Sequence, residues 1–246
     1  MSKNKATMGI VAFLLMVGML SMGLNYIVAG VVTIVIVMVF NGGKNFSAYK
    51  DRTELLQTDC DPEAFLKMTA ELRNQSKNNA KMQSYLQIDE AVGLMTLGQF
   101  EEAKAIMIAI DSDKLPTKYH IGLIHKMNLM YCLYELGEIE EAEFVYEDVL
   151  PLLSVDDLHV QLTKDVLLAE RAYFLEEYEE CKLLIAPLLD KGLKKRTYLT
   201  LVYRLAQMAE KSGDLETAKA KYQQVADEGN KLWIANCSRT KMAELE

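Results

Sequence analysis

The chain divides into two parts that differ in how apolar and polar residues are arranged. Residues 6–43 contain no charged side chain, whereas residues 44–246 mix apolar and charged positions throughout. From about residue 78 onward, apolar positions recur at the three- and four-residue spacing of amphipathic helices. No stretch keeps the two-residue alternation of a strand. The pattern therefore predicts an all-α protein.

The uncharged segment is long enough for two short membrane spans. As one helix, its 38 residues would extend about 57 Å, but the hydrocarbon core of a bilayer is about 30 Å thick. The weakest point is residues 21–26, which include a glycine and two polar side chains. We therefore predict a transmembrane helical hairpin with spans at 7–22 and 26–40, in contact with the lipid bilayer through residues 7–40.

Charges on both sides of this segment predict its orientation. Lys3 and Lys5 precede it, and Lys44, Lys50 and Arg52 follow it. Because positive residues favour the cytoplasmic side, we expect an integral cell-membrane protein whose remaining chain lies in the cytoplasm. The segment has no ionisable residue of the kind that pumps need, so it is expected to be an anchor. A single tilted span, with the rest of the chain outside, and a cleaved signal peptide remain alternatives.

The chain after the anchor is predicted to fold as one helical domain. Residues 1–43 form the anchor, residues 44–60 a linker, and residues 61–246 the domain. The segment Asp61-Pro62-Glu63 has the capping side chain, the first-turn proline and the acidic residue of a helix start. Residues 61–75 and 232–245, the latter with Trp233, are expected to cap the two ends of the domain.

Four similar short turns recur within this domain. They are Leu97-Gly98-Gln99-Phe100-Glu101-Glu102-Ala103, Leu136-Gly137-Glu138-Ile139-Glu140-Glu141-Ala142, Leu175-Glu176-Glu177-Tyr178-Glu179-Glu180-Cys181 and Ser212-Gly213-Asp214-Leu215-Glu216-Thr217-Ala218. The second residues of these turns are 39, 39 and 37 positions apart. Self-similarity at such a period is typical of stacked helical units, which bury their apolar faces only against neighbours.

These turns resemble those of the tetratricopeptide repeat family, in which a tight glycine turn joins two helices. The matching triplets are Gly98/Phe100/Ala103, Gly137/Ile139/Ala142 and Gly213/Leu215/Ala218, with Glu176/Tyr178/Cys181 as a variant that lacks the glycine. The resemblance covers about residues 79–228, with a period longer than the family's 34 residues. It implies a tetratricopeptide-like α-solenoid of about four helix pairs after the transmembrane hairpin.

Composition and motifs argue against catalysis and nucleic-acid binding. Residues 44–246 contain 25 basic and 35 acidic residues, a net charge of −10, whereas nucleic-acid binding needs clustered cations. The four cysteines and three histidines lack zinc-site spacing, and no phosphate-binding or hydrolase motif occurs. We expect no catalytic, cofactor-binding or metal-binding residue and no enzyme activity. The basic residues Lys191, Lys194, Lys195 and Arg196 are expected to be solvated, with contact to anionic lipid head groups as the alternative.

The resemblance also implies a binding groove lined by the first helix of each pair. The positions carried over are Met127, Asn128, Tyr131, Tyr134, Val166, Glu170, Tyr173, Phe174, Tyr203, Arg204 and Gln207. Tyrosine suits such a surface because it combines apolar area with a hydrogen-bonding group. Packing between first helices is the alternative role for these tyrosines. The expected function is a scaffold or adaptor for an unidentified protein or peptide; the alternative is an accessory subunit of a membrane enzyme or a transport or secretion complex.

Overall fold

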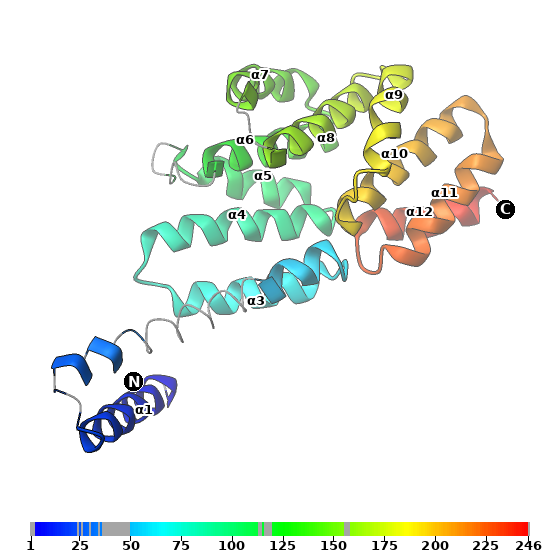
Figure 1. Cartoon of the computed structure of the whole chain (residues 1–246). Helices are drawn as coiled ribbons and strands as arrows, with labels where there is room; N and C mark the ends of the chain where they lie inside the picture. The colour runs from blue at the N-terminus through cyan, green and yellow to red at the C-terminus, as the bar shows by residue number, and fades with distance from the viewer. Residues whose placement is uncertain are drawn as a thin grey trace. The chain divides into compact units, whose positions relative to one another are not determined.

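A computed structural model describes residues 3–23, 25, 27–29, 31–33, 35, 50–112, 115, 120–154 and 158–245 (Figure 1). These residues form helices and turns, and no strand occurs among them. The chain forms two compact units, Met1–Asp51 and Arg52–Glu246. The boundary falls within the predicted linker, and the predicted limits at residues 43 and 60 stay predictions.

The first unit contains helix α1, Lys3–Ser21, and corrects the predicted membrane hairpin. Among the described residues, no helix is long and apolar enough to cross a membrane, so the predicted fold class is wrong in this part. Residues 6–21, the uncharged part of α1, extend about 24 Å, less than the hydrocarbon core of about 30 Å. Much of the second predicted span, residues 26–40, lies outside the described residues. The integral membrane location and the bilayer contact rested on this hairpin and stay predictions.

The second unit is built from helices that pack consecutively along the chain. After a helical segment at 52–57 come α3 (Pro62–Gln75), α4 (Ala80–Thr96), α5 (Phe100–Ala109), α6 (Ile121–Glu135), α7 (Ile139–Val149), η3 (Leu150–Ser154), α8 (Leu158–Phe174), α9 (Tyr178–Leu189), α10 (Lys195–Ser212), α11 (Leu215–Glu228) and α12 (Trp233–Leu245). The four turns singled out in the sequence join α4 to α5, α6 to α7, α8 to α9 and α10 to α11, and the two helices of each pair pack together. Consecutive helices of this unit therefore pack in a solenoid-like manner.

Backbone conformation and burial explain the repeated turn sequence. Gly98, Gly137 and Gly213 have φ between 77° and 83°, the left-handed conformation that glycine adopts more readily than other residues. Glu176 adopts a φ of 61° at the equivalent position, although it is not a glycine. The small residues five positions further on, Ala103, Ala142, Cys181 and Ala218, are fully buried. Their short side chains let the two helices of each pair approach closely.

The last helices of this unit return to its first helices. The Lys231 N–H donates to the Cys60 carbonyl over 3.2 Å, and the Asn230 side chain donates to the Asp59 carbonyl over 2.9 Å. Trp233, at the start of α12, packs edge-on against Phe100 with ring centroids 5.4 Å apart. In Figure 1 the starts of α10 and α12 accordingly lie beside the start of α3 and the end of α4. The C-terminal part of the chain therefore forms one wall of the inner face of the repeats.

Candidate binding cavity

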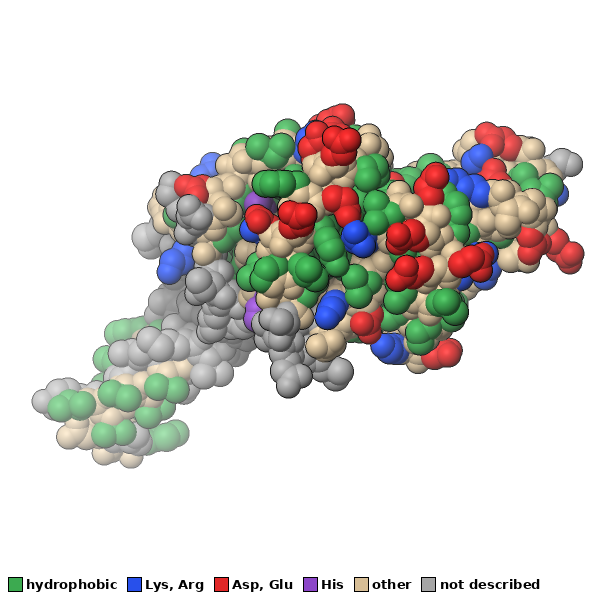
Figure 2. Space-filling view, turned by 90° about the horizontal axis from the view of Figure 1, so that it is seen from above, with side chains coloured by type: hydrophobic (Ala, Val, Ile, Leu, Met, Phe, Trp, Pro, Cys, Tyr) green, Lys and Arg blue, Asp and Glu red, His purple; other side chains and the backbone are tan. Residues whose placement is uncertain are grey.

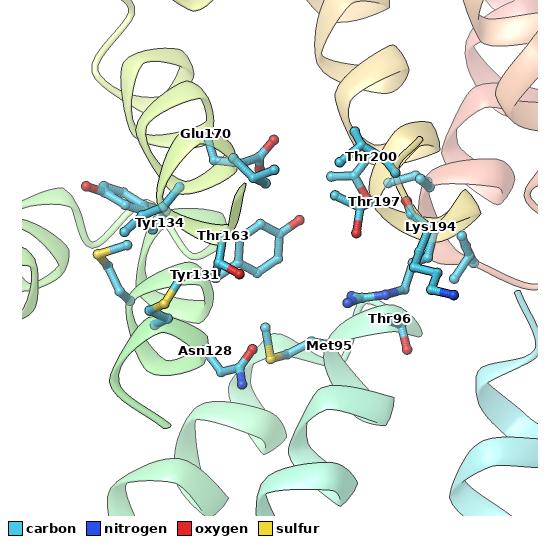
Figure 3. Close-up of a pocket in the computed structure, with 18 of the residues that line it drawn as sticks. Met95, Thr96, Asn128, Tyr131, Tyr134, Thr163, Glu170, Lys194, Thr197 and Thr200 are labelled. Atoms are coloured by element: carbon cyan, nitrogen blue, oxygen red, sulfur yellow. Dashed lines mark hydrogen bonds between the residues drawn. The ribbon is translucent and has the colours of Figure 1, made fainter. Parts of the chain in front are cut away.

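A cavity of about 330 Å³ lies on the inner face of the helical unit (Figure 3). Its walls come from the end of α4, the middle of α6 and α8, the start of α10 and residues 232–234 at the start of α12. The lining is mostly apolar, with Met95, Met130, Leu162 and Trp233 among its members. Hydroxyl, amide and charged groups are set into this apolar surface at a few positions, an arrangement typical of ligand sites.

One wall of the cavity contains six of the eleven residues predicted for the groove. They are Met127, Asn128, Tyr131 and Tyr134 on α6 and Val166 and Glu170 on α8. Within each helix these positions are one, three or four residues apart, so they share one face. Figure 3 shows the Tyr131 ring directed into the space between α6 and α10. The structure thus brings these six side chains together around one cavity.

The other five predicted residues lie behind this wall. Tyr173 and Tyr203 are only 9% and 4% exposed and belong to the hydrophobic core, the packing role kept open as the alternative. Phe174 stacks on Tyr134 with ring centroids 4.9 Å apart. Arg204 is 1% exposed, and its Nη1 donates to the Gln207 side chain over 3.1 Å. Simple repeat offsets do not predict this because they do not account for the burial of α10 and of the end of α8 against neighbouring helices.

Arg204 organises a buried charge cluster behind the cavity. Its Nε and Nη2 groups donate to the Glu170 carboxylate over 3.1–3.4 Å, and Nη2 also donates to the Glu135 carboxylate. The same nitrogen lies 3.4 Å from the Tyr131 hydroxyl oxygen, to which it donates. The guanidinium is also within 4.6 Å of the ring centroids of Tyr173 and Phe174. Arg204 on α10 therefore ties together α6 and α8 and fixes the cavity side chains Tyr131 and Glu170.

Burial dominates the electrostatics of this cluster. Burial raises the pKa of Glu170, although the Arg204 guanidinium opposes this increase. Burial alone would lower the pKa of Arg204, but the Glu170 and Glu135 carboxylates raise it well above its usual value. Burial also holds the pKa of the Tyr131 phenol well above 10, so its hydroxyl stays protonated. The Glu170 carboxylate is committed to Arg204 and is not a free base in the cavity wall.

The opposite wall was not predicted as a site. It comprises Leu193, Lys194, Arg196, Thr197 and Thr200 around the start of α10, together with Leu232, Trp233 and Ile234. The sequence had singled out the basic run at 191–196 and Trp233, but only as solvated charge and as part of a cap. These residues face α6 and α8 only because the C-terminal helices pack against the first helices of the unit. No local sequence pattern predicts this long-range packing.

Candidate metal ligands and nucleophiles do not converge on the cavity. Among the described residues, no group of three or more His, Cys, Asp or Glu side chains is placed to hold a metal ion. Buried His125 contacts the Met107 carbonyl through Nε2 at 2.8 Å, which is a packing interaction between helices. Burial raises the pKa of the Cys132 and Cys181 thiols to about 12, so both stay protonated at neutral pH.

Comparisons of the chain with models of protein families, with curated proteins and with solved structures find no match. The resemblance to tetratricopeptide repeats therefore rests on the four turns and their packing residues. What the chain binds has to be inferred from the cavity itself, from its lining, its charge and its accessibility.

Proposed function

We propose that the helical unit is a protein-interaction module, a scaffold or adaptor that holds an extended segment of a partner protein in the cavity between α6, α8 and α10. The main support for this proposal is the cavity, because six of the residues predicted from the sequence to face a ligand line it. Tetratricopeptide-like repeats, which the turns resemble, are a family of binding modules, and this supports the same reading.

The size and the composition of the cavity fit a few peptide side chains. Its volume of about 330 Å³ lies near the lower end of the range of small-ligand sites, about 300–1,000 Å³. Tyr131 and Trp233 supply aromatic surface from opposite walls, and such residues contribute strongly to binding energy at interfaces. Because Arg204 holds Tyr131 in place, little side-chain entropy is lost when a ligand packs against its ring.

Peptide selection on the purified full-length protein tests the proposal. A library of displayed random peptides is selected against the wild-type protein, and the enriched sequences are measured by fluorescence polarisation. The blocking variant is Thr163→Trp, because Thr163 is exposed and lines the cavity on α8, so an indole there fills the space. The matched control is Gln161→Trp, which puts the same side chain on the same helix at an exposed position outside the cavity lining.

We expect enriched peptides whose affinities for the wild type and for the Gln161→Trp variant are equal. Their affinity for Thr163→Trp should fall at least about tenfold, which corresponds to about 1.4 kcal/mol. Unchanged binding by a folded Thr163→Trp protein would move the site elsewhere, for example to the outer surface between α5 and α7 that exposes Ile108 and Phe144. Failure to enrich any peptide would also contradict the proposal.

A further inference from the structure

Arg196 differs from the other arginines that are buried or half-buried in the helical unit. Those arginines pair with carboxylates, Arg52 with Asp89, Arg73 with Glu90, Arg171 with Glu143, and Arg204 with Glu135 and Glu170. Arg196 is also partly buried, and it lines the cavity. Within the part of the chain that the structure describes, no carboxylate forms an ion pair with it. The cavity wall therefore contains a positive charge that no carboxylate of the described residues neutralises.

The hydrogen bonds of Arg196 are also incomplete. Its Nε group donates to the Gln57 side chain over 3.2 Å, while Nη1 and Nη2 have no acceptor among the described residues. Burial lowers the pKa of Arg196, which shows the cost of removing this charge from water. A guanidinium presents a rigid fork of donors whose geometry matches that of a carboxylate. Two free donor groups at a partly desolvated site therefore favour an anionic ligand.

The neighbours of Arg196 add to this preference. Lys194, the capping residue of α10, also lines the cavity, and no side chain caps the start of that helix. Thr197 and Thr200 lie in the first two turns of α10, and Figure 3 shows both in the same wall as Lys194, facing the cavity. On the far wall, the Glu170 carboxylate is already bound by Arg204 and leaves the charge of Arg196 unopposed.

This positive wall stands out against the charge of the whole chain. The chain has 35 acidic and 27 basic residues, and Figure 2 shows acidic side chains spread over one face of the helical unit. An acidic ligand gains nothing from this overall field, so its attraction has to come from the local groups of the cavity. Apolar side chains, Met95, Met130, Leu162 and Val166 among them, fill the rest of the lining. The ligand should therefore combine a carboxylate with adjacent apolar groups.

We propose that the cavity recognises an acidic side chain within the partner segment, with its carboxylate on Arg196 and Lys194 and the flanking apolar side chains against the α6 and α8 wall. This inference rests on the proposed peptide-binding function and specifies the chemistry of the peptide. An internal Glu or Asp between two apolar residues satisfies both parts of the cavity lining.

Two short peptides that differ only in charge test the inference on the full-length protein. They are N-acetyl-Leu-Glu-Leu-amide and N-acetyl-Leu-Gln-Leu-amide, whose blocked ends exclude binding through a terminal carboxylate. Trp233 is the only tryptophan of the chain and lies in the cavity wall, so its fluorescence reports occupancy directly. The variants are Arg196→Gln and the control Lys195→Gln, which removes an adjacent positive charge that does not line the cavity.

The glutamate peptide should bind the wild type and Lys195→Gln about tenfold more tightly than the glutamine peptide, as expected for hydrogen bonds to a charged group. Arg196→Gln should bring this ratio close to one, while circular dichroism shows an unchanged helical fold. Equal binding of both peptides by the wild type would overturn the inference and leave the peptide-binding function standing. Loss of the preference in Lys195→Gln as well, or no binding of either peptide, would also overturn it.

Discussion

Replacing Arg204 with methionine should destabilise the helical unit more than any surface substitution. Methionine keeps an extended side chain but removes the guanidinium from between Glu135 and Glu170, whose side chains are 9% and 7% exposed. Removing one partner of a buried ion pair costs about 3–5 kcal/mol, because the remaining charge stays unpaired. For a domain of about 150–250 residues, each kcal/mol lowers Tm by about 2–4 °C, so Tm should fall by about 6–20 °C.

The cost of Arg204→Met should also depend on pH in a defined direction. Burial raises the folded-state pKa of Glu170 even with Arg204 present, and removing Arg204 raises it further. A carboxyl whose pKa is higher in the folded than in the unfolded state favours folding when protonated and loses this contribution as pH rises through the folded-state pKa. The destabilisation of the variant relative to the wild type should therefore be smaller at about pH 5 than at about pH 7.

Thermal unfolding of the full-length protein, followed by circular dichroism at both pH values, measures these effects. The control is Lys126→Met, since Lys126 pairs with Asp148 over 2.8 Å at the surface, where the two side chains are 30% and 59% exposed. Loss of such a pair costs at most about 1 kcal/mol. If Arg204→Met costs no more than this control, or costs the same at both pH values, the buried charge cluster does not stabilise the cavity wall as described.

The turns make three further predictions, all measurable as shifts in Tm of the full-length protein. Gly137→Val should destabilise the unit by about 1–3 kcal/mol. The cause is backbone strain alone, because φ is 77° there and an added Cβ meets nothing within 4 Å. Gly137→Asn should cost less, because asparagine tolerates this conformation better. Ala142→Leu should cost about 1–3 kcal/mol by overpacking a fully buried helix contact, and an unchanged Tm would refute the assigned repeat alignment. Glu176→Gly should stabilise by up to about 1 kcal/mol because it relieves a φ of 61°, whereas Glu177→Gly, at a φ of −80°, should not raise Tm.

The local features of the fold could be predicted from the sequence because short-range physics determines them. A glycine followed at fixed distances by a large apolar and a small residue specifies a left-handed turn and a close helix contact, as at Gly137 and Ala142. The same periodicity selected six side chains of α6 and α8 that line one cavity, because positions three or four apart share a helix face. Tyr203 and Arg204 were placed by the same offsets, yet they lie inside the unit.

Features that depend on distant contacts could not be predicted in this way. The second cavity wall exists because residues near Trp233 return to the first helices of the unit, more than 130 positions earlier in the chain. Nothing in the local sequence of Arg196 distinguishes a cation in a cavity wall from one in solvent. At the other end of the chain, the length of the uncharged stretch suggested two membrane spans divided at residues 21–26. Helix α1 does end at Ser21, but no helix of the described residues is long and apolar enough to cross a membrane.

The structure of the full-length protein with a selected peptide bound to it would show directly whether the cavity is the binding site. We expect the peptide to lie between α6, α8 and α10, with an acidic side chain in contact with Arg196 and an apolar side chain against Tyr131 or Trp233. A peptide bound on the outer surface between α5 and α7, beside Ile108 and Phe144, with the cavity left open, would contradict this expectation.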